Sequence, residues 1–206
     1  MTSDELPGMA AAFRRGADEA SAALAKWLGR PVTLAVQRLE AVPLTTAAAA
    51  LGSGAEPVCG CAMGISGAIG GVLLLAAADQ DALALADTLI ERPPGTSTSW
   101  NEIERSALIE TANIVGCSYL NVVCNMLVPE RAEGILPSPP LFLRDFPAAL
   151  MEAMLLELPS PAETVLLART AFAVDATAVR CGLLFLPDAE SLARLRDAAD
   201  GPRSRP

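Results

Sequence analysis

The chain has 206 residues, of which 52% are hydrophobic, so it is long and apolar enough to form a globular core. Its formal net charge of −9 argues against nucleic-acid binding, because phosphate backbones require clustered Lys and Arg, and favours a protein partner. The sequence contains no histidine, which excludes Ser-His-Asp and Cys-His catalysis within the chain and any histidine metal ligand.

Helix and strand signals alternate along the first half of the chain. Good helix formers precede a glycine stop, an alternating run predicts a strand, and a glycine-containing turn joins two apolar runs. The expected elements are a helix at 9–28 ending at Gly29, a strand opened by Pro31, a short helix at 45–51, a hairpin at 57–77 turning at Ser66-Gly67, and a helix from its cap Asp79 to about Glu91.

The second half repeats this order of signals after the turn-rich connector RPPGTSTS. The expected elements are a long helix capped by Ser99 or Asn101 and reaching about Leu127, an edge strand or loop containing Pro137, Pro139 and Pro140, a helix at 147–158, two strands at 164–174 and 179–186, and a helix from its cap Asp188 to about Ala199.

Residues as well as patterns recur between the halves. GVLLL at 71–75 is echoed by GLLFL at 182–186. A period of half the chain is too long for a solenoid and indicates an internal duplication. We therefore expect an α+β fold (α/β layered), in which two pseudo-symmetric, intertwined repeats share one antiparallel sheet flanked by helices. The expected boundaries are a single domain at 1–200 with repeats at about 9–92 and 100–199, and a disordered tail at 201–206.

Features of the sequence also predict where the protein is found. The first eight residues carry Asp4 and Glu5 instead of the positive charge and apolar stretch of a secretory signal. The longest uncharged apolar run, roughly 68–78, is too short to cross ~30 Å of hydrocarbon. The five cysteines, an odd number, are typical of reduced thiols. A cytoplasmic protein without membrane insertion is expected.

Two glycine and cysteine patterns have simple structural interpretations. Cys59 and Cys61 lie two residues apart without a second pair at ligand spacing, so they are interpreted as small residues on one strand face. The glycines between 64 and 71 lie between two predicted strands, with no following helix or Lys-Ser/Thr, so a hairpin turn is favoured over a phosphate loop.

The segment at 106–127 combines an apolar helix with a narrow polar stripe. Glu110 and Asn113 are three residues apart, so their side chains point the same way, roughly 4.5 Å apart along the helix axis. A carboxamide can hold a water in one orientation, and a carboxylate can pair with a partner lysine. Polar stripes are usually the solvated surface of a helix, so the pair alone does not define an enzyme. The stripe consists of Ser106, Glu110, Asn113, Cys117 and Asn121.

The spacing of Ser106, Glu110 and Asn113 resembles the signature of the CheC, CheX and FliY chemotaxis phosphatases. That signature is Asp or Ser, three residues, Glu, two residues, Asn, and a proline downstream. The surrounding stretches ETANIVGCSYLN, ILPSPPLFLRD and LAKWLGRPVTL also resemble the family, and the resemblance extends from about residue 9 to 199.

The resemblance implies a CheC-like fold and a phosphatase that hydrolyses the aspartyl phosphate of a CheY-like response regulator in chemotaxis signalling. Asn113 would align the attacking water, and Glu110 would pair with the conserved lysine of the receiver domain. The chain would need no cofactor of its own, because Mg²⁺ is expected on the response-regulator substrate. The partners implied are the phosphorylated regulator and, in some relatives, a CheD-type receptor deamidase.

This sequence departs from the family pattern in two ways. Relatives often carry the signature in both halves, but here alignment places Ala11 and Arg14 at the first site, so one intact site is expected, on the second signature helix. The spacing from Asn113 to Pro137 is also one residue longer than usual. A non-catalytic or weakly catalytic module that binds the phosphorylated regulator or a CheD-type deamidase remains the alternative, as does a structural role like that of flagellar-switch middle domains.

Overall fold

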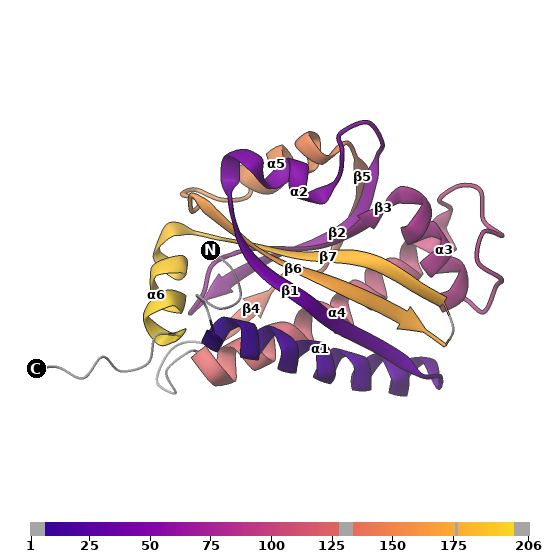
Figure 1. Cartoon of the computed structure of the whole chain (residues 1–206), viewed down its shortest axis with the longest axis horizontal. Coiled ribbons are helices and arrows are strands. Elements are labelled where there is room, and N and C mark those ends of the chain that lie inside the picture. The colour runs from indigo at the N-terminus through magenta and orange to yellow at the C-terminus, as the bar shows by residue number, and fades with distance from the viewer. Residues whose placement is uncertain (1–6, 128–133, 176, 200–206) are drawn as a thin grey trace, which may run out of the picture.

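A twisted antiparallel sheet separates two layers of helices (Figure 1). The computed structural model describes residues 7–127, 134–175 and 177–199, and within them the sheet has seven strands. The helices are α1 (Pro7–Leu28), α2 (Ala47–Leu51), α3 (Asp79–Leu89), α4 (Glu102–Leu127), α5 (Pro147–Leu156) and α6 (Ala189–Ala199). The strands are β1 (Val32–Pro43), β2 (Val58–Gly67), β3 (Gly71–Ala78), β4 (Ile135–Pro137), β5 (Leu141–Asp145), β6 (Thr164–Val174) and β7 (Thr177–Pro187).

The elements agree closely with those expected from the sequence. Gly29 ends α1 in a left-handed conformation with φ of 66°, and a 3-10 turn at Leu44–Thr46 leads into α2. The proline-containing region after α4 forms two edge strands, β4 and β5, that pair with β2, and Pro139 and Pro140 lie in the short connection between them. The predicted tail at 201–206 lies outside the described residues.

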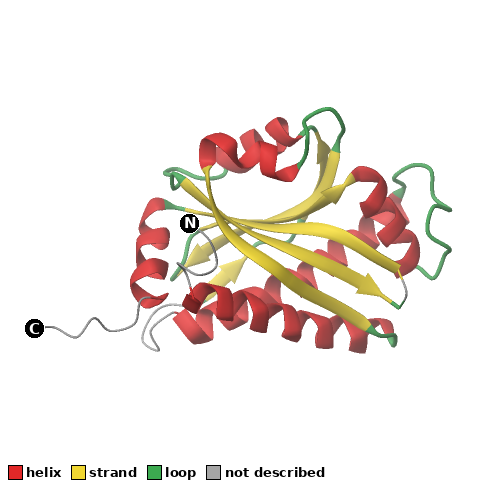
Figure 2. Cartoon of the chain, in the orientation of Figure 1, coloured by secondary structure: helices red, strands yellow, loops and turns green. Residues whose placement is uncertain are grey.

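The long helices α1 and α4 cover one face of the sheet, and α2 and α5 cover part of the other (Figure 2). Small residues on α1 allow α4 to approach closely. Ala12, Gly16 and Ala20 are buried at intervals of four, which forms a shallow groove along the helix. Tyr119 of α4 packs against Gly16 and meets the ring of Phe13 edge-on, with 5.6 Å between the ring centroids.

The sheet order is β1-β6-β7-β3-β2-β4, with β5 also pairing to β2. The first half of the chain contributes the β2–β3 hairpin and the second half contributes the β6–β7 hairpin. The two hairpins meet at the centre of the sheet, where β3 pairs with β7. The first strand of each half crosses to the hairpin of the other half, since β1 pairs with β6 while β4 and β5 pair with β2. The two repeats are therefore intertwined as the sequence predicts.

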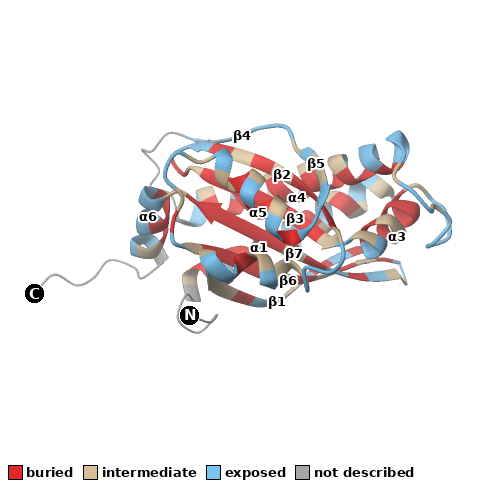
Figure 3. Cartoon of the chain, turned by 90° about the horizontal axis from the view of Figure 1, so that it is seen from above, coloured by how far each residue is buried: buried red, intermediate tan, exposed pale blue. Residues whose placement is uncertain are grey.

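The echoed segments lie side by side at the centre of the molecule. GVLLL and GLLFL occupy β3 and β7, which pair antiparallel, with Val72 opposite Leu186 and Leu75 opposite Leu183. A pseudo-two-fold axis passes between these strands, because each half presents the same edge to the other. Their side chains enter the cores on both faces of the sheet, and the central strands are buried while α6 is largely exposed (Figure 3).

The turn of the first hairpin lies later in the chain than expected. Ser66 and Gly67 are the last residues of β2, and the connection to β3 is 68–70. The strand extends this far because Ser66 pairs with Leu136 and Gly67 with Ile135 on β4. Pairing with a strand from the other half thus lengthens β2 beyond its local turn signal.

The two aspartates expected to cap helices behave differently. Asp188 accepts a hydrogen bond from the Ser191 backbone N–H at 2.7 Å, which confirms it as the cap of α6. Asp79 is instead the first residue of α3, and no side-chain hydrogen bond caps that helix. Its carboxylate accepts hydrogen bonds from Trp100 Nε1 at 2.8 Å and from Arg144 Nε at 2.7 Å. Tertiary partners therefore take the oxygen that could have capped the helix.

Helix α4 is long and apolar enough, over 25 residues, to cross a membrane by length and composition alone. The sequence prediction considered only runs without charges and missed it. More than half of its most apolar stretch is buried against α1 and the sheet, as in the core helix of a soluble protein.

Candidate functional site

Helix α4 presents its polar stripe to solvent. Ser106, Glu110 and Asn121 are exposed, and Asn113 and Cys117 are half-buried. Among the described residues, Glu110 has no ion pair or hydrogen-bond partner. The opposite side of the helix is buried against α1 and the sheet, so the carboxylate and the carboxamide project outward together from a fixed rod.

A thiol is the polar group in contact with Asn113. Cys117 Sγ lies 3.7 Å from Asn113 Oδ1, within the range of a sulfur hydrogen bond. Burial raises the pKa of the Cys117 thiol above its ordinary value, and the negative charge of Glu110 raises it further. The three side chains therefore form one electrostatically linked group on the exposed face of α4.

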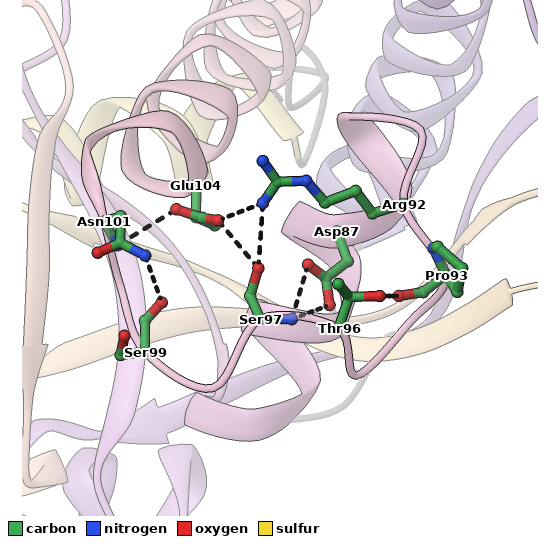
Figure 4. A network of polar contacts seen from close by, with 8 residues as sticks. All are labelled: Asp87, Arg92, Pro93, Thr96, Ser97, Ser99, Asn101 and Glu104. Atoms are coloured by element: carbon green, nitrogen blue, oxygen red, sulfur yellow. Dashed lines mark hydrogen bonds and ion pairs between the residues drawn. The ribbon is translucent and has the colours of Figure 1, made fainter.

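A polar network holds the start of α4 against α3 (Figure 4). Glu104 Oε1 accepts hydrogen bonds from Arg92 Nη1 at 2.8 Å and from Ser97 Oγ at 2.9 Å. Its other oxygen accepts the backbone N–H of Asn101 at 3.2 Å, which completes the first turn of the helix. Asp87 accepts the backbone N–H of Ser97 at 3.0 Å and 3.2 Å. The loop between α3 and α4 is thereby fixed at both ends.

The two carboxyl groups of this network are buried, and their surroundings lower the pKa of each. Burial raises the pKa of Asp87, but hydrogen bonds from Ser97 and from backbone N–H groups outweigh it. For Glu104, its own backbone N–H, Ser97, the backbone of Asn101 and the charge of Arg92 lower the pKa against the cost of burial. Their stabilising effect is present above the ordinary carboxyl pKa and is lost as the pH falls through the lowered values.

An aromatic cluster supports the next turn of α4. The rings of Trp100 and Phe142 lie 5.0 Å apart, and the guanidinium of Arg105 lies 5.4 Å from the centroid of the Phe142 ring. These contacts join α4 to the edge strand β5. They also engage the guanidinium of Arg105, which is the nearest cation before Glu110 in the sequence. This agrees with the lack of an ion pair at Glu110 among the described residues.

The middle of α4 packs tightly on the sheet and on α1. A Cβ atom on Gly116 would lie 3.0 Å from Met63 Cε on β2, so the glycine allows the helix to approach the sheet closely. Tyr119 anchors the other side against Gly16. Packing on both sides limits movement of α4, and the turn that carries Glu110 and Asn113 is therefore a rigid platform.

The corresponding positions on α1 carry different chemistry. Ala11 and Arg14 are both exposed on α1, and the guanidinium of Arg14 has no polar partner among the described residues. A methyl group and a guanidinium cannot act as a carboxylate and a carboxamide, because neither can accept a hydrogen bond. Helix α1 therefore serves as a packing element beside α4.

In the described part of the chain, Glu110 and Asn113 lie on the outward face of a helix. A cleft of about 580 Å³ lies between the β2–β3 hairpin and α6, and its lining contains neither Glu110 nor Asn113. Two polar side chains on the outward face of a helix suit contact with the surface of another macromolecule, whereas small molecules are usually bound in concave sites.

The cysteine and glycine patterns have the structural roles expected of them. Cys59 and Cys61 are buried on the same face of β2 and belong to the core, and burial raises the pKa of Cys61 to about 12. The five cysteines are free thiols. The glycine-rich segment joins β2 to β3 as a hairpin.

Sequence reasoning missed the groups that orient the platform. Asp87 and Glu104 were not singled out, although Glu104 stands at the third position of its helix, where it can accept the N–H of the residue before the helix. Ile103 was also missed: it is 56% exposed and lies seven residues before Glu110, on the same face of α4. The available signal was a single Ile among the polar residues NEIERS at 101–106.

No family model and no curated protein matches the chain. The intertwined, two-repeat architecture with long helices on one face of the sheet is nevertheless that of a known class, the CheC-like fold. The chain therefore has a CheC-like fold, as the sequence predicted.

Particular solved structures support this assignment. FliY from Thermotoga maritima aligns with a TM-score of 0.76, with 14% identity over 98% of this chain and 99% of that one. The FliM middle domain from H. pylori aligns with a TM-score of 0.65, with 10% identity over 96% and 99%. The chemotaxis protein CheX from Desulfovibrio desulfuricans aligns with a TM-score of 0.50, with 11% identity over 87% and 99%. At these identities the similarity defines the fold alone.

Proposed function

We propose that the chain binds the phosphorylated receiver domain of a CheY-like response regulator and hydrolyses its aspartyl phosphate, with Glu110 and Asn113 as its single active site. The observation that carries the proposal is the joint projection of an unpaired carboxylate and a carboxamide from one rigid turn of α4. The similarity of the fold to CheX, named as a chemotaxis protein, is consistent with a role in that signalling.

The proposed chemistry needs only positioning from this chain. Asn113 holds a water in line with the acyl phosphate, the water oxygen attacks phosphorus, and the bond between phosphorus and the aspartate oxygen breaks. The products are the free aspartate carboxylate of the receiver and inorganic phosphate. Mg²⁺ belongs to the receiver substrate and neutralises charge on the phosphoryl oxygens there.

Glu110 acts in docking. Its carboxylate lacks a cation among the described residues, so it can form a charge-assisted hydrogen bond with the lysine of the receiver. Ile103 extends the same face by about 10 Å along the helix and provides an apolar contact beside the charged one. This combination fits a protein surface that carries a lysine next to an acidic phosphate-bearing cleft.

The test is release of phosphate from candidate receivers. Each receiver is labelled with radioactive phosphate in the presence of Mg²⁺, and loss of label is followed with and without this protein. Faster release with at least one receiver, abolished by Asn113→Ala, is the expected result. If no receiver loses phosphate faster, the enzymatic assignment is wrong.

A second candidate is a binding module without significant turnover. The solved FliM domain of H. pylori, which has a similar fold, is recorded in a complex with FliG and in another with SpeE. Of the two long helices α1 and α4, only α4 carries the acid–amide pair. A single pair also suits a protein that binds its phosphorylated partner and hydrolyses the phosphate slowly. Binding of a CheD-type deamidase belongs to this second candidate. Localisation in the cytoplasm remains a prediction under both.

A further inference from the structure

Cys117 and Asn113 are neighbours on the exposed face of α4. They are four residues apart, which places one side chain over the other on a helix. Cys117 Sγ lies 3.7 Å from Asn113 Oδ1, and both side chains are half-buried. No other described residue forms a hydrogen bond with the carboxamide of Asn113.

The protonation state of the thiol determines which end of the carboxamide faces it. Burial and the nearby Glu110 both raise the pKa of Cys117, so the thiol keeps its proton at neutral pH. A protonated thiol donates S–H and is only a weak acceptor. The carboxamide therefore turns Oδ1 toward Cys117, as observed, and directs its two Nδ2–H donors away from the thiol.

The torsion that this contact restrains is otherwise soft. The last side-chain torsion of asparagine has broad, roughly two-fold preferences, so an unrestrained carboxamide samples both orientations. With Oδ1 held by one of its two lone pairs, the second lone pair and both N–H groups remain available to a water and a phosphoryl oxygen.

We propose that Cys117 is a positioning residue that fixes the carboxamide of Asn113 in the orientation needed to align the attacking water. This inference rests on the proposed function and deepens it, because it assigns a role to a residue outside the Glu-x-x-Asn pair. Cys117 acts through Asn113 and does not touch the phosphate.

The positioning role predicts an effect on turnover and not on docking. An orientation that matters at the transition state changes kcat, whereas receiver binding through Glu110 is unaffected and KM stays the same. Cys117→Val fills the space without a donor and is expected to lower kcat about threefold to tenfold, as for loss of a weak hydrogen bond. Cys117→Ser restores a donor and is expected to keep kcat within about twofold of wild type.

The matched control is Cys124→Val on the same helix. Cys124 is also half-buried but lies eleven residues beyond Asn113, more than 15 Å along the axis, so kcat and KM should both stay at wild-type values. All three variants are measured on a CheY-like receiver phosphorylated with acetyl phosphate in the presence of Mg²⁺. Thermal unfolding of each variant shows whether it is folded at the assay temperature.

A second readout does not depend on activity. The chain has four asparagines, Asn101, Asn113, Asn121 and Asn125, so the side-chain amide of Asn113 can be identified in an NMR spectrum by its loss in Asn113→Asp. We expect this signal to shift or broaden in Cys117→Val, to stay close to wild type in Cys117→Ser, and to be unchanged in Cys124→Val.

The two readouts separate the possible failures. If Cys117→Val leaves both kcat and the Asn113 amide signal unchanged, or if Cys117→Ser is as impaired as Cys117→Val, the positioning role is overturned. If the amide signal responds as expected while the wild-type chain hydrolyses no receiver phosphate, the contact stands as structural positioning and the phosphatase assignment fails.

Discussion

Helices α1 and α4 begin the two halves of the chain and pack against each other on the same face of the sheet, yet they present different chemistry to solvent. On α4 the exposed turn carries Glu110 and Asn113, whereas the aligned turn of α1 carries Ala11 and Arg14. Both helices bury apolar or small residues on the inner side, and Tyr119 of α4 packs against α1.

The difference shows that scaffold and site are under separate requirements. The inner faces must fill the space between two helices and a sheet, so their sizes are constrained by packing. The outer faces are not constrained in this way, and substitution there changes chemistry while the fold persists. A CheC-like fold by itself therefore does not define an active site, and each helix has to be judged by its exposed residues.

The largest expected effect removes the amide from the intact helix. Asn113→Ala should lower the rate of phosphate release by about 10²–10³, because losing one oriented group at a charged transition state costs about 3–4 kcal/mol. The measurement is radiolabelled phosphate release from the receiver, with circular dichroism to verify folding. Release at the wild-type rate would show that α4 and α1 do not differ in catalysis.

The second prediction concerns the packing that both helices share. A Cβ atom added at Gly16 would lie 2.8 Å from Tyr119 Cδ1 and 3.1 Å from its Cα, so Gly16→Ala should force the helices apart. Overpacking of this kind costs about 1–3 kcal/mol, which exceeds the gain in helix propensity. Urea unfolding measures the change in the free energy of unfolding. Ala22→Gly, at an exposed position of α1, is the matched control for helix propensity without packing. A stabilised Gly16→Ala variant would contradict the contact.

A smaller effect is expected when the docking charge is removed. Glu110→Gln keeps the size of the side chain but loses the ion pair with the receiver lysine, so KM should rise about tenfold while kcat changes little. Titration of the receiver concentration in the release assay separates the two parameters. Reversing the charge of the receiver lysine should raise KM for the wild-type chain, but it should not raise KM further for Glu110→Gln. If the two changes raise KM additively, Glu110 does not contact this lysine.

The smallest effect belongs to the first helix. Arg14→Ala removes an exposed side chain from a position that carries no acid–amide pair, so kcat and KM should stay within about twofold of wild type.

The comparison becomes sharper when the acid–amide pair is built into α1. The double change Ala11→Glu with Arg14→Asn, placed in an Asn113→Ala background, should recover part of the lost phosphate release if the two turns are geometrically equivalent.

The sequence alone determined much of the fold. Local signals placed most helices and strands within about two residues of their observed ends, because helix formers, glycine stops and alternating apolar runs act over short distances. The echo of GVLLL in GLLFL predicted the duplication, and the pairing of β3 with β7 brings these two segments together. The candidate pair on α4 followed from spacing and family resemblance, and its role remains a prediction.

Only the tertiary structure decided the features that depend on residues distant in the chain. β2 extends through Gly67 because it pairs with β4, which is about 70 residues away, and Asp79 leaves its capping role because Trp100 and Arg144 reach its carboxylate. The hydrogen bonds by which Asp87 and Glu104 hold the start of α4 were likewise settled by contacts formed in the folded chain. Local sequence sets what a segment can form, and the partners that packing brings to it set what its polar atoms do.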